Sequence, residues 1–148
     1  MTTDQTASLP EITVDRALAP DFPRLRHQFA LADIDAHHLD SDPGVDDQGL
    51  FVARANRDAV GLMRLGPTFF RRPFVELLLV HPDHRRRGVG TALLRHARQL
   101  HAGAKLFTST NLSNQPAQAL FARCGFRLCG YVDELDPGDP ELIFVWSG

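Results

Sequence analysis

Residues 74–94, FVELLLVHPDHRRRGVGTALL, constrain the fold more strongly than any other stretch of this 148-residue chain. The apolar run Phe74–Val80 predicts a buried strand, and an amphipathic helical pattern follows Gly88 at once. Three consecutive arginines, Arg85–Arg87, lie between the two predicted elements. Gly88 and Gly90 would let the backbone approach a ligand closely, and a helix start offers unpaired N–H groups and partial positive charge. The segment therefore predicts an anion site between a strand and a helix.

Other kinds of anion-binding or basic segment differ from this one in sequence. A Walker P-loop requires Gly-x-x-x-x-Gly-Lys-Ser/Thr, and a dinucleotide-binding turn requires Gly-x-Gly-x-x-Gly; neither pattern is present. The arginines alone would also fit solvated loop charges or a small nucleic-acid patch. A formal net charge of −2 argues against a general nucleic-acid binder, so any positive field must be local.

A second segment, residues 105–126, reads KLFTSTNLSNQPAQALFARCGF. It predicts a strand, an Asn at the start of a short helix, and then Gly125-Phe126 opening the next strand. Together with Arg85-x-x-Gly88-x-Gly90 and its flanking strand and helix, this pattern resembles the GNAT N-acyltransferase superfamily. The resemblance covers about residues 50–146.

The resemblance implies an α+β fold with a central, mixed but mostly antiparallel sheet and helices on both faces. It implies acetyl-CoA as the acyl donor, with no metal and no covalent enzyme intermediate. It places the pyrophosphate of coenzyme A on residues 85–91 and the thioester carbonyl on backbone N–H groups at a bulge around Leu78–Val80. The cofactor-binding residues expected from it are Leu78, Leu79, Val80, Arg85, Arg86, Arg87, Gly88, Val89, Gly90, Thr91, Asn114 and Phe121. Asn is also a preferred helix cap, so for Asn114 capping remains an equal alternative.

Glu76 is the candidate general base, because it is the only carboxylate within the predicted strand. Its even spacing from Leu78 and Val80 predicts that it shares their face; the alternative is an exposed residue paired with Arg71 or Arg72. Many GNAT enzymes carry Leu-Tyr on the helix after the Asn, and that tyrosine is thought to protonate the departing thiolate. Here the pair is Leu120-Phe121, so the usual acid is missing. Tyr131, the only tyrosine, would replace it only if the fold turned it inward.

The remaining pattern predicts a layout of alternating short elements. Residues 1–10 form a loose tail and residues 11–148 a single domain, which is a suitable size for one core. Residues 35–48 and 132–141 are acidic and turn-rich, so we expect loops there. The elements expected outside the two motifs are strands 12–17, 50–55, 60–65, 125–131 and 142–146 and a helix from Pro20 to about Ile34.

Further expectations concern the cysteines, metal binding and the location of the protein in the cell. Cys124 and Cys129 lack a C-x-x-C spacing and are expected to be reduced core residues. His81 and His84 flank Pro82 without a third ligand nearby, so we expect loop histidines and no metal site. The N-terminal residues do not resemble a signal peptide and no apolar stretch approaches the ~20 residues of a membrane span, so we expect a cytoplasmic protein.

We expect the chain to transfer the acetyl group of acetyl-CoA to a primary amine. The alternative is a non-catalytic acyl-CoA-binding sensor or regulatory protein, which the missing tyrosine at Phe121 favours and Glu76 opposes. The acceptor stays open between a small amine, an antibiotic, an amino acid and a protein. No nucleic-acid or membrane partner is expected, and a homodimer stays open as well.

Overall fold

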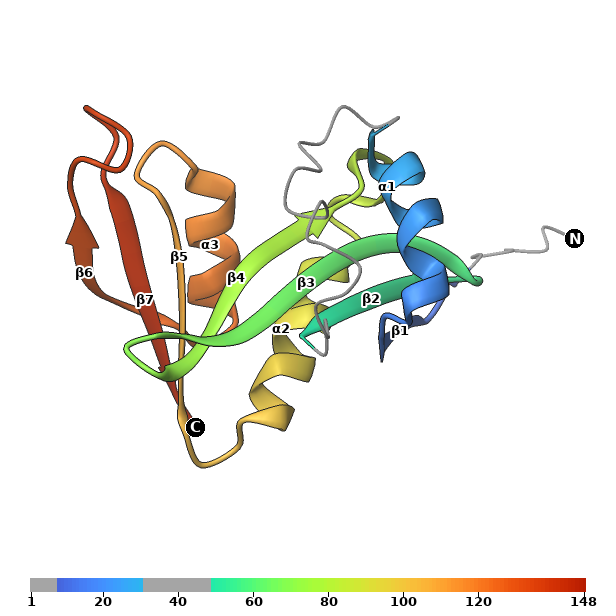
Figure 1. The fold of residues 1–148 in the computed structure, drawn as a ribbon, viewed down its shortest axis with the longest axis horizontal. Helices are drawn as coiled ribbons and strands as arrows, with labels where there is room; N and C mark the ends of the chain where they lie inside the picture. The colour runs from blue at the N-terminus through green and yellow to red at the C-terminus, as the bar shows by residue number, and fades with distance from the viewer. Residues whose placement is uncertain (1–7, 31–48) are drawn as a thin grey trace, which may run out of the picture.

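A computed structural model describes residues 8–30 and 49–148 of the chain. These residues form one seven-stranded sheet with the strand order β1-β2-β3-β4-β5-β7-β6 (Figure 1). The elements are, in chain order, β1 Ile12–Arg16, η1 Ala19–Asp21, α1 Phe22–Ala30, β2 Leu50–Ala55, β3 Asp58–Phe69, β4 Arg72–Val80, η3 Pro82–His84, α2 Val89–Leu100, β5 Lys105–Asn111, α3 Gln115–Arg123, β6 Arg127–Val132 and β7 Glu141–Ser147.

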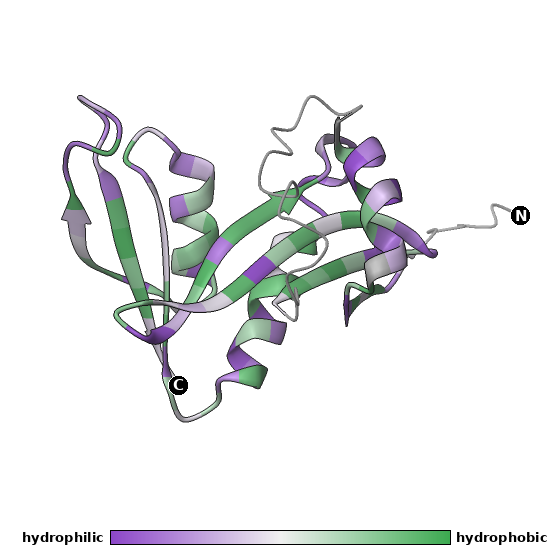
Figure 2. Ribbon diagram, in the orientation of Figure 1, coloured by the Kyte–Doolittle hydropathy of each residue, from purple (hydrophilic) through white to green (hydrophobic). Residues whose placement is uncertain are grey.

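The sheet is mixed but mostly antiparallel, and it carries helices on both faces, as predicted. Every neighbouring pair of strands is antiparallel except β4 and β5, which run parallel. One core lies between the sheet and helices α2 and α3, with Met63, Leu93 and Phe121 among its buried members. A second, smaller core lies on the opposite face beneath α1 and contains Leu25, Phe29 and Leu62. Figure 2 shows that hydrophobic residues predominate along β2, β4 and β7.

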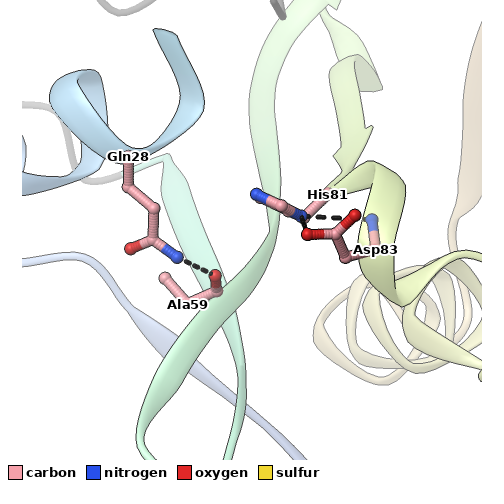
Figure 3. Close-up of polar contacts among 4 residues, drawn as sticks. All are labelled: Gln28, Ala59, His81 and Asp83. Carbon is pink, nitrogen blue, oxygen red and sulfur yellow. Dashed lines mark hydrogen bonds and ion pairs between the residues drawn. The ribbon is translucent and has the colours of Figure 1, made fainter. Parts of the chain in front are cut away.

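A polar contact joins helix α1 to the sheet in addition to the apolar face of the helix. Nε2 of Gln28 donates a hydrogen bond of 2.6 Å to the carbonyl oxygen of Ala59 on β3 (Figure 3). Phe29, one residue further along, is completely buried. The helix is described up to Ala30, so its predicted extension to Ile34 lies outside the described residues, as do the predicted loop at 35–48 and residues 1–7 of the predicted tail.

Strands β3 and β4 are longer than the sequence predicts. The prediction ended the first strand at Leu65 and treated residues 66–73 as a loop, whereas the two strands continue to a two-residue turn at Phe70 and Arg71. Both turn residues have positive φ, at 51° and 63°. Two-residue hairpins favour such turns, but usually with Asn or Gly. A Phe-Arg turn gives no signal that sequence reasoning would recognise.

The prediction that both cysteines are core residues is correct for Cys124 and wrong for Cys129. Cys124 is buried at the end of α3, whereas Cys129 is exposed on β6, the last strand of the sheet. The register between β6 and β7 shifts between Leu128 and Gly130, which leaves Cys129 as the extra residue of a bulge. An edge strand has a neighbouring strand on one side only, so fewer side chains surround its residues and they are more exposed to solvent.

The parallel pair β4 and β5 determines where a ligand can enter the fold. The two strands pair only at Phe74 with Phe107 and at Val75 with Thr108. Beyond that point they diverge, and Figure 1 shows the sheet opening between β4 and β5 towards the ends of both strands. The hydroxyl of Thr108, which is buried, donates to the carbonyl oxygen of Val75 at 3.2 Å and joins the strands at the point of divergence.

Candidate active site

A cleft of about 750 Å³ lies between the diverging strands and the first turns of α2 and α3. Its walls come from the second half of β4, the loop and helix start after it, the second half of β5, and α3. The residues that line the cleft include Glu76, Leu78, Val80, Arg85, Gly88, Gly90, Asn114 and Phe121. The fold thus brings both sequence motifs, the arginine-glycine segment and the helix after Asn114, to one cleft.

The arginine-glycine segment forms the part of the cleft next to α2. Gly88 is the N-cap of α2 and adopts a left-handed conformation with φ of 80°. Arg85, Arg86, Val89 and Thr91 line the same cleft, and the side chain of Arg86 is exposed. Arg87 belongs to the same segment, but it is exposed and does not line the cleft.

The two glycines of this segment meet different requirements. A Cβ atom on Gly88 would have no heavy atom within 4 Å, so this position opens onto free space. A Cβ atom on Gly90 would lie 2.7 Å from Cδ2 of Leu120, which belongs to α3. Gly88 therefore fits the predicted close approach of a ligand, whereas the small size of Gly90 is also required by the contact between α2 and α3.

The outer edge of β4 is unpaired along the cleft. The N–H of His81 donates to the carbonyl oxygen of Val60 on β3 at 2.8 Å. Because hydrogen-bonding groups alternate sides along a strand, the N–H groups of Leu78 and Val80 point away from β3, towards the opening between β4 and β5. Since β5 pairs with β4 only at Phe74 and Val75, no described strand satisfies these two groups.

Glu76 lies at a bulge, and its surroundings differ from the prediction. Arg64 of β3 pairs with Leu77 and Leu65 pairs with Val75, so Glu76 is the extra residue on β4. The bulge predicted around Leu78–Val80 is therefore displaced towards the start of the strand.

Because a bulge breaks the alternation of side chains, even spacing from Leu78 and Val80 does not place Glu76 in their apolar surroundings. Its side chain is exposed, and Oε1 accepts a hydrogen bond of 2.6 Å from the hydroxyl of Thr68. Glu76 nevertheless lines the cleft.

The start of α3 forms the opposite wall of the cleft. Oδ1 of Asn114 accepts a hydrogen bond of 3.2 Å from the N–H of Ala117, so Asn114 caps the helix while also lining the cleft. Phe121 lines the cleft too, but it is only 3% exposed and its ring packs against Phe126 and Phe144. These contacts explain why an apolar ring is accommodated at this position.

Tyr131 was expected to act as the general acid only if the fold turned it inward, and this condition is not met. It lies on the edge strand β6, its residue is 66% exposed, and it is not among the residues that line the cleft. The fold therefore does not turn it inward. Phe121 lines the cleft whereas Tyr131 does not, and the described cleft contains no tyrosine.

His81 and His84 shape the loop that leads from β4 to α2. Nδ1 of His81 accepts a hydrogen bond of 3.2 Å from the N–H of Asp83 and lies 3.9 Å from its carboxylate (Figure 3). The ring of His81 packs edge-on against Phe29 of α1 and against His84. In residues 8–30 and 49–148, no group of three or more His, Cys, Asp or Glu side chains could hold a metal ion.

Sequence reasoning missed part of the cleft wall on β5 and α3. Thr108, Ser109, Thr110 and Arg123 line the cleft, and Thr108 and Thr110 are buried polar residues. The sequence did contain a signal: three consecutive hydroxyl residues, Thr108-Ser109-Thr110, follow an apolar pair in a predicted strand, where hydroxyl groups need a polar partner. The parallel pairing that brings it beside β4 is not visible in the sequence.

The sheet order, the divergence of β4 from β5 and the glycine-capped start of α2 define the N-acyltransferase class that the sequence motifs resemble. The profile of the acetyltransferase (GNAT) family matches residues 12–126. The chain belongs to this family, whose members use acetyl-CoA as the acyl donor. In the described residues, no helix is long and apolar enough to cross a membrane.

Individual relatives differ in the acceptors that their names state. Peptidyl-lysine N-acetyltransferase YjaB of Escherichia coli (strain K12) is 31% identical over 131 residues, which are 86% of this chain and 80% of that protein. A mycothiol acetyltransferase of Parafrankia sp. (strain EAN1pec) is 38% identical over 97 residues, but this chain spans only 30% of its length. The crystal structure of a GNAT acetyltransferase from Bacillus cereus ATCC 10987 has a TM-score of 0.79 and 28% identity, and covers 93% of this chain and 97% of that chain.

Proposed function

We propose that this protein transfers the acetyl group of acetyl-CoA directly to a primary amine. The observation that carries the proposal is the cleft between β4 and β5, which joins an unpaired strand edge to the glycine-capped start of α2. In acetyl-CoA the pantetheine arm separates the anionic pyrophosphate from the thioester, and this order of groups matches the order of the two surfaces along the cleft.

The pyrophosphate would bind at residues 85–91. Arg85 and Arg86 line the cleft beside the first turn of α2, where the helix leaves N–H groups without internal partners. Gly88 keeps the space in front of these groups free of a side chain. Arginine side chains and a helix start act on an anion in the same direction, so the two contributions reinforce each other.

The unpaired N–H groups of Leu78 and Val80 would polarise the thioester carbonyl. Negative charge develops on this oxygen when the amine attacks the carbonyl carbon, and donors fixed in a strand need no reorganisation to stabilise it. The new C–N bond then forms, the C–S bond breaks, and coenzyme A leaves as a thiolate. The main role of the protein is to hold the two reactants near attack distance.

Glu76 would accept the proton of the attacking amine, directly or through a water molecule. A carboxylate next to the point where β4 and β5 diverge lies close to the place where the thioester would meet the amine. Thr68 donates a hydrogen bond to Oε1 of this carboxylate, so Oε2 would be the oxygen that accepts the proton. A carboxylate also attracts an ammonium group before deprotonation.

Solvent would protonate the thiolate of coenzyme A, because Phe121 has no proton to give and Tyr131 does not line the cleft. A thiol with a pKa of about 8.5 is a modest base when ionised, so a dedicated acid contributes less than it would for an alkoxide. The burial of Phe121 against Phe126 and Phe144 is also the observation that favours the alternative function, a non-catalytic acyl-CoA-binding protein.

Calorimetry with acetyl-CoA, followed by free-thiol release in the same sample, tests the proposal. The acceptor panel contains a lysine peptide, because the relative YjaB is named a peptidyl-lysine N-acetyltransferase, together with small primary amines. Binding with amine-dependent thiol release would support the transferase. Binding without release for any amine would favour the acyl-CoA sensor, and the absence of binding would overturn both.

A further inference from the structure

Exposed apolar side chains gather on the last strand of the sheet. Of the nine large apolar side chains that are exposed among the described residues, three lie on β6: Leu128, Tyr131 and Val132. Leu112 and Leu135 adjoin the same end of the sheet, where the N–H of Leu112 donates to Pro140 of the β6–β7 turn at 2.8 Å. Apolar residues scattered singly need no explanation, but a group along a free strand edge indicates an interface.

The outer edge of β6 is free for strand pairing. β6 pairs with β7 on one side only, and Figure 1 shows it at the rim of the sheet. A Cβ atom on Gly130, in the middle of the strand, would meet no heavy atom within 4 Å, so the face of the sheet is also open at this position. In the description of residues 8–30 and 49–148, no segment covers this edge.

The bulge at Cys129 brings Leu128 and Tyr131 to the same face of the sheet. They are three residues apart and would lie on opposite faces of a regular strand. Here Leu128 pairs with Phe144 and Tyr131 pairs with Leu142, and both of these partners pack against the core beneath α2 and α3. Leu128 and Tyr131 therefore lie on the face of the sheet that α2 and α3 cover, but at the rim of the sheet they remain 56% and 66% exposed and present an aliphatic and an aromatic side chain to solvent.

The charges of β6 are arranged so that the strand is complementary to a reversed copy of itself. Arg127 begins the strand, and Asp133 and Glu134 follow its end; all three are exposed. In an antiparallel pair of β6 strands related by a two-fold axis between Cys129 and Gly130, Leu128 would face the Tyr131 of the second copy. The same axis would bring Arg127 next to the acidic end of the other strand. A two-fold axis satisfies both contacts twice.

We propose that β6 is the interface of a homodimer, formed by antiparallel pairing of β6 with the β6 of a second copy of this chain. This pairing would join the two seven-stranded sheets into one continuous sheet and would remove the free edge from solvent. The occupant is a second copy because a reversed β6 offers a partner for the apolar pair and for both charged ends at once.

Sedimentation equilibrium of the full chain over a range of concentrations tests the proposal. We expect a monomer–dimer equilibrium, and Leu128→Glu should raise the dimer dissociation constant at least roughly tenfold, since it sets a charge against an apolar side chain. Leu100→Glu is the matched control, because Leu100 is 50% exposed on α2 whereas Leu128 is 56% exposed on β6. A monomer at every concentration, or equal effects of the two substitutions, would overturn the proposal.

Two further measurements identify the interface independently of the apolar contact. Arg127→Glu should weaken the dimer, and adding Asp133→Arg should restore it, since the exchange re-creates the attraction with opposite sign. Cys129 lies next to the proposed axis, so a short bismaleimide should cross-link two wild-type chains but not two Cys129→Ser chains, while the buried Cys124 stays unreactive. A dimer that does not cross-link through Cys129 would show that another surface forms it.

Discussion

Replacing Thr108 with valine removes the hydroxyl that joins β4 to β5 where the two strands diverge. Thr108 is 1% exposed, and its Oγ1 donates to the carbonyl oxygen of Val75 at 3.2 Å. Valine has nearly the same shape, so the substitution leaves no cavity but removes the donor. Loss of a partner for a buried polar group costs about 1–3 kcal/mol.

This cost is large enough to measure by thermal or denaturant unfolding. In a domain of this size, each kcal/mol lowers the Tm by roughly 2–4 °C, so Thr108→Val should lower it by about 2–12 °C. Urea unfolding monitored by circular dichroism should show a lower midpoint with an unchanged slope, because the surface exposed on unfolding is the same.

Thr110→Val is the matched control for Thr108→Val. Thr110 lies two residues further along β5 on the same face and is also buried, but no hydrogen bond of its hydroxyl is found within the described part of the chain. Its replacement should be nearly neutral. Equal stability changes for the two substitutions would refute the argument that the Thr108 hydroxyl holds the strands together at the divergence.

Three further predictions concern the cleft and the pH dependence of folding. Gly88→Trp should abolish coenzyme A binding in calorimetry, because its side chain would enter the open space in front of α2, while the φ of 80° adds only about 1–2 kcal/mol to the folding cost; undiminished affinity would exclude this segment as the pyrophosphate site. Glu76→Gln should reduce turnover most at low pH, where the amine is hardest to deprotonate, and an unchanged pH–rate profile would assign Glu76 a structural role. Burial lowers the pKa of His96 from its ordinary value of 6.5, against the opposing attraction of Asp15. The folded state therefore binds its proton less readily than the unfolded state, so the contribution of His96 to stability is fully present above pH 6.5 and is lost as the pH falls through the lowered pKa. His96→Gln should reduce this dependence in urea unfolding at pH 7.5 and 5; an identical dependence in both proteins would contradict it.

Local signals in the sequence were sufficient for the elements whose ends are determined by their own residues. Helix α3 runs from Gln115 to Arg123, as predicted, because Asn114 caps it and Pro116 fits its first turn. The apolar run of β4 was recognised for the same reason. Register was not recognisable: the bulge at Glu76, the Phe70-Arg71 turn and the pairing of Thr108 with Val75 all depend on the neighbouring strand.

The two glycines of the arginine-glycine segment show most clearly what a motif cannot separate. In the sequence, Gly88 and Gly90 are equivalent members of one pattern, and both were predicted to allow close approach of a ligand. In the structure, Gly88 has a positive φ and open space before it, whereas Gly90 faces Cδ2 of Leu120 at 2.7 Å. Gly88→Ala should therefore act through the backbone conformation and the ligand, and Gly90→Ala through the packing of α2 on α3. Combining each with Leu120→Ala separates the two effects, because the smaller side chain should offset the stability loss of Gly90→Ala and leave that of Gly88→Ala unchanged. If Leu120→Ala offset neither loss, the contact between the helices would not be the reason for glycine at position 90.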